Sequence, residues 1–406
     1  MISYIFIVLI IALTFHKKEL GLYVTTIFSP GLLSISVPGV GTTYFVLSVF
    51  FFVLCISELE RFFKNHSPFR IVIVLMVIAW AMSAVIAKDK HYYGFFIWLM
   101  EFAVIPICCW VSLKKTEKNV ELFIKVAKII CYIVVIYSFM EVTTRQNLYV
   151  DVCVAEKIFQ GHFIDVLRFG LKRCQAFFSW HETLGGFCMV TGAFFQCLFL
   201  ANNAQDKKNH TYLRLALLLY VTGFLTGSRS SILAIVIALF PILFKKKKYL
   251  LIVPLVLVLL VIAMPEYFQE ILDSFTDTQS VSGSNSEMRE GQLELSIWYL
   301  SKASNVWFGQ GFSFADNNVV GVEAAMAGAE SIWFRTIIDQ GILGVISVAY
   351  TFLYSIYKCF RMDKRFIFFP LAYLVARTVA VIPSMSLSYI FIFIMLLMLQ
   401  NKKINA

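Results

Sequence analysis

One arginine, Arg229, stands alone between two apolar stretches in the segment LTGSRSSILA. A guanidinium at the depth of membrane hydrocarbon costs about 2.5–3.5 kcal/mol even on the scale derived from insertion experiments, so it needs an anionic partner. A phosphate suits it best, because the planar guanidinium can bind two phosphate oxygens at once. Arg335 and Arg377 also lie within apolar segments. These residues predict a site for a phosphate-bearing lipid.

The amino-acid composition indicates what kind of secondary structure carries these arginines. The chain has 406 residues, of which 59% are hydrophobic and 15% are charged. Soluble domains have about 45–50% apolar and about 25% charged residues. Apolar stretches of about 15–22 residues recur along the chain and predict an all-α, polytopic integral membrane protein. The net charge of +10 does not indicate nucleic-acid binding, because Lys and Arg cluster in short loops as in an inner membrane protein.

The basic clusters set the predicted topology. If all of them are cytoplasmic, the helices between them must come in pairs. The first segment, ISYIFIVLIIALTF, reads as a retained helix, because it lacks a basic start and a small-residue cleavage site. With it the sequence predicts about 12–13 transmembrane helices. The paired helices are expected at 20–37 and 41–58, 70–87 and 93–113, 122–142 and 182–202, 212–227 and 230–244, 249–265 and 332–357, and 366–383 and 386–400.

Two long connections then fall on the extracytoplasmic side, at about 143–181 and at 266–331. The second is the largest polar stretch of the chain. Within it Leu293, Ile297 and Leu300 recur at helical spacing, with Trp298 beside them, and predict an amphipathic helix at the membrane interface. Gly309 and Gly311 follow and predict a tight turn back toward the membrane. The whole chain, 1–406, is expected to form a single membrane domain.

The nine cysteines do not indicate a metal site. Most lie inside apolar stretches, where they behave as small hydrophobic residues, and no CxxC or Cys/His ligand spacing occurs. Cys153 and Cys174 fall in the same predicted outer loop and could pair. The sequence predicts no metal and no cofactor.

The order of several motifs resembles the O-antigen ligase and polymerase superfamily. TGSRSSILA comes first, then Arg289 about twenty residues before FGQGF, then AESIWFRTIIDQGILG. The earlier stretch RCQAFFSWHETLGGFC also resembles a family segment that precedes a mid-chain helix. The resemblance covers roughly 165–350, and the order of the motifs is more specific than any one of them.

The resemblance implies an enzyme that transfers a glycan from an undecaprenyl diphosphate carrier to an acceptor hydroxyl. The reaction would take place at the outer face of a bacterial plasma (inner) membrane. Arginines would stabilise the departing diphosphate, and a base would accept the proton of the acceptor hydroxyl. No Asp-x-Asp pair for a divalent ion lies in an outer loop, which favours a metal-independent mechanism. The implied partners are the lipid-linked donor and acceptor, membrane lipid and a chain-length regulator protein.

Five residues are the predicted substrate-binding set. Arg229 and Arg289 are the first candidates for the diphosphate, and Arg173, Arg335 and His181 follow. Three of these arginines also have a purely structural interpretation. Arg229 could extend toward lipid headgroups from a helix end, whereas Arg289 and Arg173 could be solvated surface charges.

The predicted catalytic base is Glu330, where the ligase pattern has His-Asn and this chain has Glu330–Ser331. A glutamate could serve if partial burial raised its pKa, although nearby arginines would lower it. The alternative is an acid that complements a helix dipole. His181 with Glu182 is the second candidate base site.

Two further charges have structural alternatives. Arg377 could pair with a buried acid such as Glu101 or Asp339. Asp339 matches an acidic position of the family, yet packing and a helix bend around Gly341 and Gly344 explain it more simply.

The leading functional hypothesis is a polymerase that joins lipid-linked oligosaccharide repeats into O-antigen, capsule or exopolysaccharide. The missing His-Asn favours a polymerase over a ligase that moves finished polymer to a different acceptor. A transporter or flippase for lipid-linked glycans would explain a cationic cavity equally well. That class predicts inverted repeats, however, and no internal repeat is visible.

Overall fold

The computed structural model describes residues 2–64, 67–88, 91–158, 167–168, 171–201, 207–245, 286–320, 322–323, 331–379 and 385–404. Of these residues 81% are helical, which agrees with the all-α class. The only strands in these ranges form two short antiparallel pairs, β1 (Ser36–Val37) with β2 (Gly41–Thr42) and β3 (Leu167–Arg168) with β4 (Leu171–Lys172).

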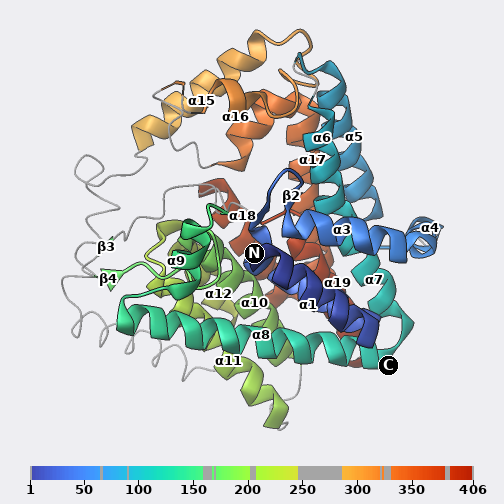
Figure 1. Ribbon diagram of the computed structural model, residues 1–406, viewed down its shortest axis with the longest axis vertical. Coiled ribbons are helices and arrows are strands. Elements are labelled where there is room, and N and C mark those ends of the chain that lie inside the picture. The colour runs from blue at the N-terminus through green and yellow to red at the C-terminus, as the bar shows by residue number, and fades with distance from the viewer. Residues whose placement is uncertain are drawn as a thin grey trace.

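The helices follow one another as separate rods through most of the chain (Figure 1). Those of the first part are α1 (Ile2–His16), α2 (Lys18–Phe28), α3 (Thr43–Leu54), α4 (Ile56–Lys64), α5 (Arg70–Ile86), α6 (Tyr92–Leu99), α7 (Ile105–Lys115), α8 (Glu117–Thr144) and α9 (Leu148–Ala155). Those of the second part are α10 (His181–Ala201), α11 (Lys207–Leu225), α12 (Arg229–Lys245), α15 (Ser286–Ser301), α16 (Phe314–Asn318), α17 (Ile332–Met362), α18 (Phe368–Val379) and α19 (Tyr389–Ile404). Three short turns of other helix types join them: η1 (Leu32–Ser34), the π-helical η2 (Met100–Val104) and η4 (Lys364–Ile367).

Length and apolar character make four of the described helical stretches able to cross a membrane. They are Tyr92–Lys115, Glu117–Thr144, His181–Ala201 and Ile332–Met362, and six shorter apolar helices accompany them. Large apolar side chains also face outward, among them Val8, Ile71 and Ile136, each more than half exposed. Such surfaces need lipid around them, so the chain is a membrane protein. The total of about 12–13 spans stays a prediction, since the segment 249–265 lies outside the described residues.

The early part of the chain differs from the prediction. A helix was expected over 20–37, but α2 ends at Phe28. Pro30 and Gly31 interrupt it, and the chain then forms η1 and the β1–β2 pair, whose tip holds Gly39 at φ +74°. The helix expected over 41–58 is also divided, because Cys55 leaves helical geometry and α4 starts as a separate helix.

Helix α10 lies at the centre of the second part and packs against α11, α12, α18 and α19. Its buried Gln196 donates from Nε2 to the carbonyl of Ala238 on α12 (2.6 Å) and accepts from the hydroxyl of Tyr220 on α11 (2.9 Å). A satisfied polar group in an apolar interior fixes how these three helices sit against each other.

Helices α12 and α18 run antiparallel, and their contact shows which residues share an end. The ring of Phe240, late in α12, stacks on Phe368 at the start of α18 (5.9 Å between centroids). Arg229 lies eleven residues before Phe240, and Val379 lies eleven residues after Phe368. At about 1.5 Å per residue both are roughly 16 Å from that contact, in the same direction. Arg229 and the end of α18 therefore lie at the same end of the helix pair.

The described part of the polar stretch predicted to form the large outer loop contains the predicted helix, α15. Together with α16 it lies beside the N-terminal half of α17, at the top of Figure 1. Leu293, Ile297 and Trp298 are exposed, whereas the polar Gln292 and Ser296 are buried. A helix that hides polar groups and presents apolar ones is suited to an outer face in contact with lipid.

The cysteine pairing suggested by the sequence is wrong. Cys153 and Cys174 are both free thiols. Cys153 packs in a small cluster with Ile35 and Val150, whereas Cys174 belongs to the main core. Separate packing environments keep the two sulfur atoms apart.

Candidate functional site

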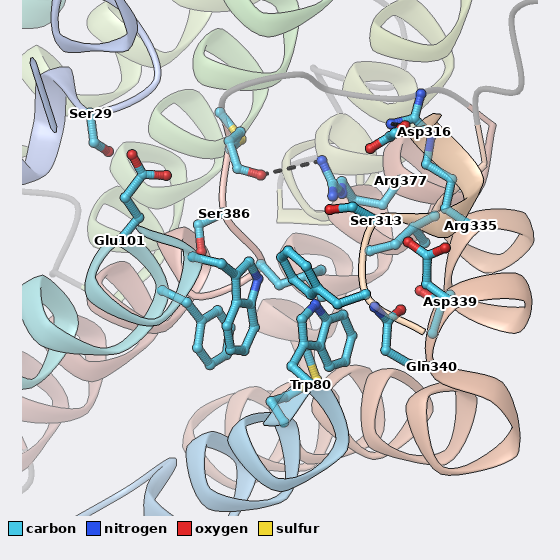
Figure 2. Close-up of a pocket in the computed structure, with 18 of the residues that line it drawn as sticks. Ser29, Trp80, Glu101, Ser313, Asp316, Arg335, Asp339, Gln340, Arg377 and Ser386 are labelled. Carbon is cyan, nitrogen blue, oxygen red and sulfur yellow. Dashed lines mark hydrogen bonds and ion pairs between the residues drawn. The ribbon is translucent and has the colours of Figure 1, made fainter. Parts of the chain in front are cut away.

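A cavity of about 360 Å³ opens between the helices of the first part and the α17–α18 region (Figure 2). Its size is at the lower end of ligand pockets, which hold about 300–1,000 Å³. The lining combines charged, hydroxyl and aromatic groups from segments far apart in the chain. They are Ser29, Tyr44, Met76, Trp80, Trp98, Glu101, Phe102, Phe312, Ser313, Asp316, Ile332, Arg335, Thr336, Asp339, Gln340, Arg377, Met385, Ser386 and Leu387.

Two arginines form one wall of this cavity, and we refer to Arg335 and Arg377 as the arginine wall. Arg335 Nη1 lies 2.7 Å from Asp316 Oδ1. Arg377 Nη1 donates to the carbonyl of Met385 (3.3 Å), the bond drawn in Figure 2. Arg377 thus shares the cavity with Glu101 and Asp339, and its described hydrogen bond goes to a backbone carbonyl.

Arg289 extends this arginine wall along α18. Its Nη2 donates to the carbonyl of Val379, at 2.7 Å, and Val379 is two residues beyond Arg377. The outer-loop helix α15 is thereby tied to the end of α18. Arg289 therefore lies close to the arginine wall, and Arg229 begins the neighbouring helix α12, which packs on α18.

The opposite side of the cavity carries a carboxylate and hydroxyl groups (Figure 2). Thr42 donates from Oγ1 to Glu101 Oε1 at 2.5 Å, and the Tyr44 hydroxyl donates to the Glu101 carbonyl at 3.2 Å. Thr42 also caps α3, because its side chain accepts from the N–H of Phe45. Glu101 belongs to the π-helical stretch Met100–Val104, a geometry that occurs frequently at functional sites.

Stacked aromatic rings form part of the cavity surface. Trp80 of α5 stacks on Trp98 of α6 (5.1 Å between centroids, 7° between planes). Trp98 in turn stacks on Phe102 (4.7 Å, 9°). These parallel rings hold α5 and the α6–η2 segment together and give the cavity a rigid apolar surface.

A kink in α17 receives the glycine turn of the outer loop. Gly341 has φ +62° and ψ −152°, outside helical geometry. A Cβ on Gly341 would lie 2.4 Å from the carbonyl oxygen of Val306, and one on Gly309 would lie 2.5 Å from that of Ile338. Hydrogen bonds join Gln310 N to Ile338 O, Ile342 N to Val306 O and Leu343 N to Trp307 O. The predicted turn at Gly309 and Gly311 is present, and its backbone docks into the kink.

Asp339 anchors the same arrangement. Its Oδ1 accepts from the N–H of Ala315 (2.7 Å), and its carbonyl accepts from the Ser83 hydroxyl (2.6 Å) and the Gly311 N–H (3.2 Å). The interpretation of this segment as a packing and bend feature agrees with these contacts.

A second polar cluster surrounds the turn before Arg229. Arg173 donates from Nε to the Thr226 carbonyl (2.9 Å), and its Nη2 lies 3.2 Å from Glu182 Oε1. His181 Nε2 lies 2.5 Å from the same oxygen. Glycine is required at 185, since a Cβ there would lie 2.1 Å from the Ser231 hydroxyl. Arg173 therefore braces the turn that starts α12, and Arg229, the first residue of α12, is half-buried beside it.

The predicted residues thus fall into two groups. Of the described residues, those lining the cavity include Arg335 but not Arg229, Arg289, Arg173 or His181. Arg289 reaches the cavity's end of α18, whereas Arg173 and His181 lie with the turn before Arg229. Glu330, the predicted base, lies outside the described residues. Sequence reasoning did not identify Asp316, and it named Glu101 only as a partner of Arg377. An acid within an apolar span is the signal that singles out Glu101.

Comparison with known proteins gives one family. No curated protein matches the chain. Residues 215–349 match the model of the family described as O-antigen ligase. The matched stretch starts within α11, ends in α17 and contains Arg229, Arg289 and Arg335. Members of this family are membrane glycosyltransferase-like enzymes. Residues 215–349, about a third of the chain, are therefore similar to the O-antigen ligase family.

Proposed function

We propose that the protein is a polysaccharide polymerase of the outer face of the bacterial plasma membrane. It transfers the glycan of one undecaprenyl diphosphate carrier onto the terminal sugar hydroxyl of another. The anomeric C–O bond to the diphosphate breaks, the diphosphate leaves with the electron pair, and the acceptor oxygen forms the new glycosidic bond. The similarity to the O-antigen ligase family supports this class of reaction. The arrangement of the site suggests which residue carries out which part of the reaction.

A set of arginines on α18 and the helices around it carries this proposal. Arg335 and Arg377 line the cavity, Arg289 binds the carbonyl of Val379, and Arg229 begins α12, which packs on α18. Asp316 already pairs with Arg335, and several guanidinium groups close together favour the binding of a further anion. A departing diphosphate carries such charge, and preorganised guanidinium groups stabilise it where it develops.

Glu330 stays the proposed base, and a single substitution tests it. It directly precedes Ser331, whose side chain caps α17 by accepting from the N–H of Trp333 (3.3 Å). We expect Glu330→Gln to lower turnover by about 10²–10⁴-fold, the usual contribution of general base catalysis. Initial rates at saturating donor would show the loss. Near-normal turnover would eliminate Glu330, and His181 with Glu182 would be tested next.

Polymerase is preferred to ligase because Glu330–Ser331 replaces His-Asn in the chain. The deciding experiment is a glycan analysis of a strain that lacks the protein, together with purified protein supplied only with lipid-linked repeats. A polymerase is expected to leave single-repeat products in the strain and to build polymer from the repeats in vitro. Unattached long chains in the strain would instead identify a ligase. Movement of lipid-linked repeats across a vesicle membrane, with no new glycosidic bond formed, would identify a transporter. The sugars, their linkage and a chain-length regulator stay outside the proposal.

A further inference from the structure

We infer that the Glu101 side of the cavity binds the acceptor sugar, and this inference rests on the proposed function. The subsite consists of the Glu101 carboxylate, the hydroxyl groups of Ser29 and Ser386, and the aromatic surface of Trp80 and Trp98. Its ligand is a phosphate-free part of the glycan with free hydroxyl groups, namely the sugar that receives the transferred chain.

The distribution of charge separates the two ends of the substrate pair. Figure 2 shows Glu101 and Ser29 across the cavity from Arg377 and Arg335. A carboxylate repels a phosphate, so the diphosphate belongs on the arginine side. A sugar hydroxyl donates well to a carboxylate, and hydrogen bonds to a charged group are roughly twice as strong as neutral ones. On the arginine side Asp316 already pairs with Arg335 (2.7 Å), and on the other side the Glu101 carboxylate favours a polyhydroxyl ligand.

The surroundings of Glu101 leave room for such a ligand. Thr42 donates to Oε1, and a carboxylate has about four acceptor positions in total. Glu101 is half-buried and lines the cavity, so its remaining acceptor positions can face a bound molecule. A carboxylate within an apolar span is costly and usually marks function. Hydroxyl donors from a ligand would offset that cost.

The aromatic surface completes a sugar site. One face of a pyranose ring is formed by C–H groups, which pack on a flat aromatic ring while the hydroxyl groups point to the sides. Trp98 is stacked with both Trp80 and Phe102, so a sugar would pack on the outer rings and edges of this stack, not between its members. At about 360 Å³ the cavity holds the terminal sugar or two, not a whole repeat unit on its carrier.

Two probes applied to the purified full-length protein test the inference. The first is the repeat glycan released from its lipid by hydrolysis, which carries no diphosphate, and the second is inorganic pyrophosphate. We expect Glu101→Gln to raise the Kd for the released glycan about tenfold and to leave the Kd for pyrophosphate unchanged, because only a charge-assisted hydrogen bond is weakened. Arg335→Gln is expected to raise the Kd for pyrophosphate and to leave the Kd for the released glycan unchanged.

The matched control is Glu121→Gln, the same change at an exposed position of α8, which should alter neither Kd. Should Glu101→Gln fail to fold, Ser29→Ala provides the milder version, with an expected loss of about threefold for the glycan. Wild-type glycan affinity in a folded Glu101→Gln protein overturns the inference, as does an equal loss for both probes. Failure of the proposed function is separate, since it would appear as no polymer from the wild-type protein.

Discussion

Replacing Arg229 or Arg289 by alanine is expected to abolish polymer while the protein still inserts in the membrane. Each guanidinium is proposed to meet the diphosphate as its charge develops, and removal of one such group typically costs about 10²–10³ in turnover. Both side chains are only half-buried, so insertion and folding should persist. Polymer length in cells and initial rates with purified lipid-linked repeats are the measurements.

Arg361→Ala serves as the control for this pair. Arg361 is exposed in the last turn of α17, at the opposite end of that helix from the arginine wall. Its loss is expected to leave polymer length and rate within about twofold of wild type, because an exposed charge contributes little. Wild-type polymer in both Arg229→Ala and Arg289→Ala would show that the diphosphate is held elsewhere.

The second large effect is expected for Gly341→Ala. The residue combines φ +62° with ψ −152°, a region open almost only to glycine, where other residues pay about 1–3 kcal/mol. The new methyl group would also lie 2.4 Å from the Val306 carbonyl oxygen and 2.5 Å from the Gly309 N–H nitrogen. We therefore expect the outer loop to leave the kink of α17, with faster proteolysis of the loop and at least about tenfold lower activity.

A glycine elsewhere in the same region provides a contrast. Gly291 lies within α15, and a Cβ there would meet nothing within 4 Å. Gly291→Ala is expected to be neutral or to stabilise the helix by about 0.5–1 kcal/mol. Equal protease resistance and activity in both alanine variants would mean that the docked loop is unnecessary for the site.

Sequence patterns predict the long apolar helices well and the interrupted ones poorly. The helices expected over 182–202 and 332–357 correspond to His181–Ala201 and Ile332–Met362. Their apolar stretches are long, and Ser331 supplies a recognisable cap. The segment after Phe28 also contains apolar residues, but Pro30 and Gly31 divert it into a turn and a strand pair. Local composition alone does not say which of these tendencies prevails.

The site is less visible in the sequence, because it is made by contacts between distant residues. The glycine turn at 309–311 was predicted, but its partner, the kink at Gly341, is set by tertiary packing. Thr42 donates a hydrogen bond to Glu101, and Asp316 forms an ion pair with Arg335. The sequence separation of the two residues predicts neither contact. Arginines in apolar segments are easier to identify from the sequence. A charged side chain in a membrane span is costly whatever its neighbours are, so it indicates a functional role.

The backbone character of the loop–kink contact has a consequence for protein engineering. The bonds from Gln310 to Ile338, from Ile342 to Val306 and from Leu343 to Trp307 all join main-chain atoms. Amino-acid identity at 306 and 307 is therefore not what makes these bonds, whereas Gln310 also donates from its side chain to the Tyr299 carbonyl (2.6 Å). A loop transplanted from a homologous enzyme would need glycine at 309 and 311, since a Cβ at 311 would lie 2.5 Å from the Ala87 Cα, and it would dock on the unchanged Gly341 and Asp339 of α17.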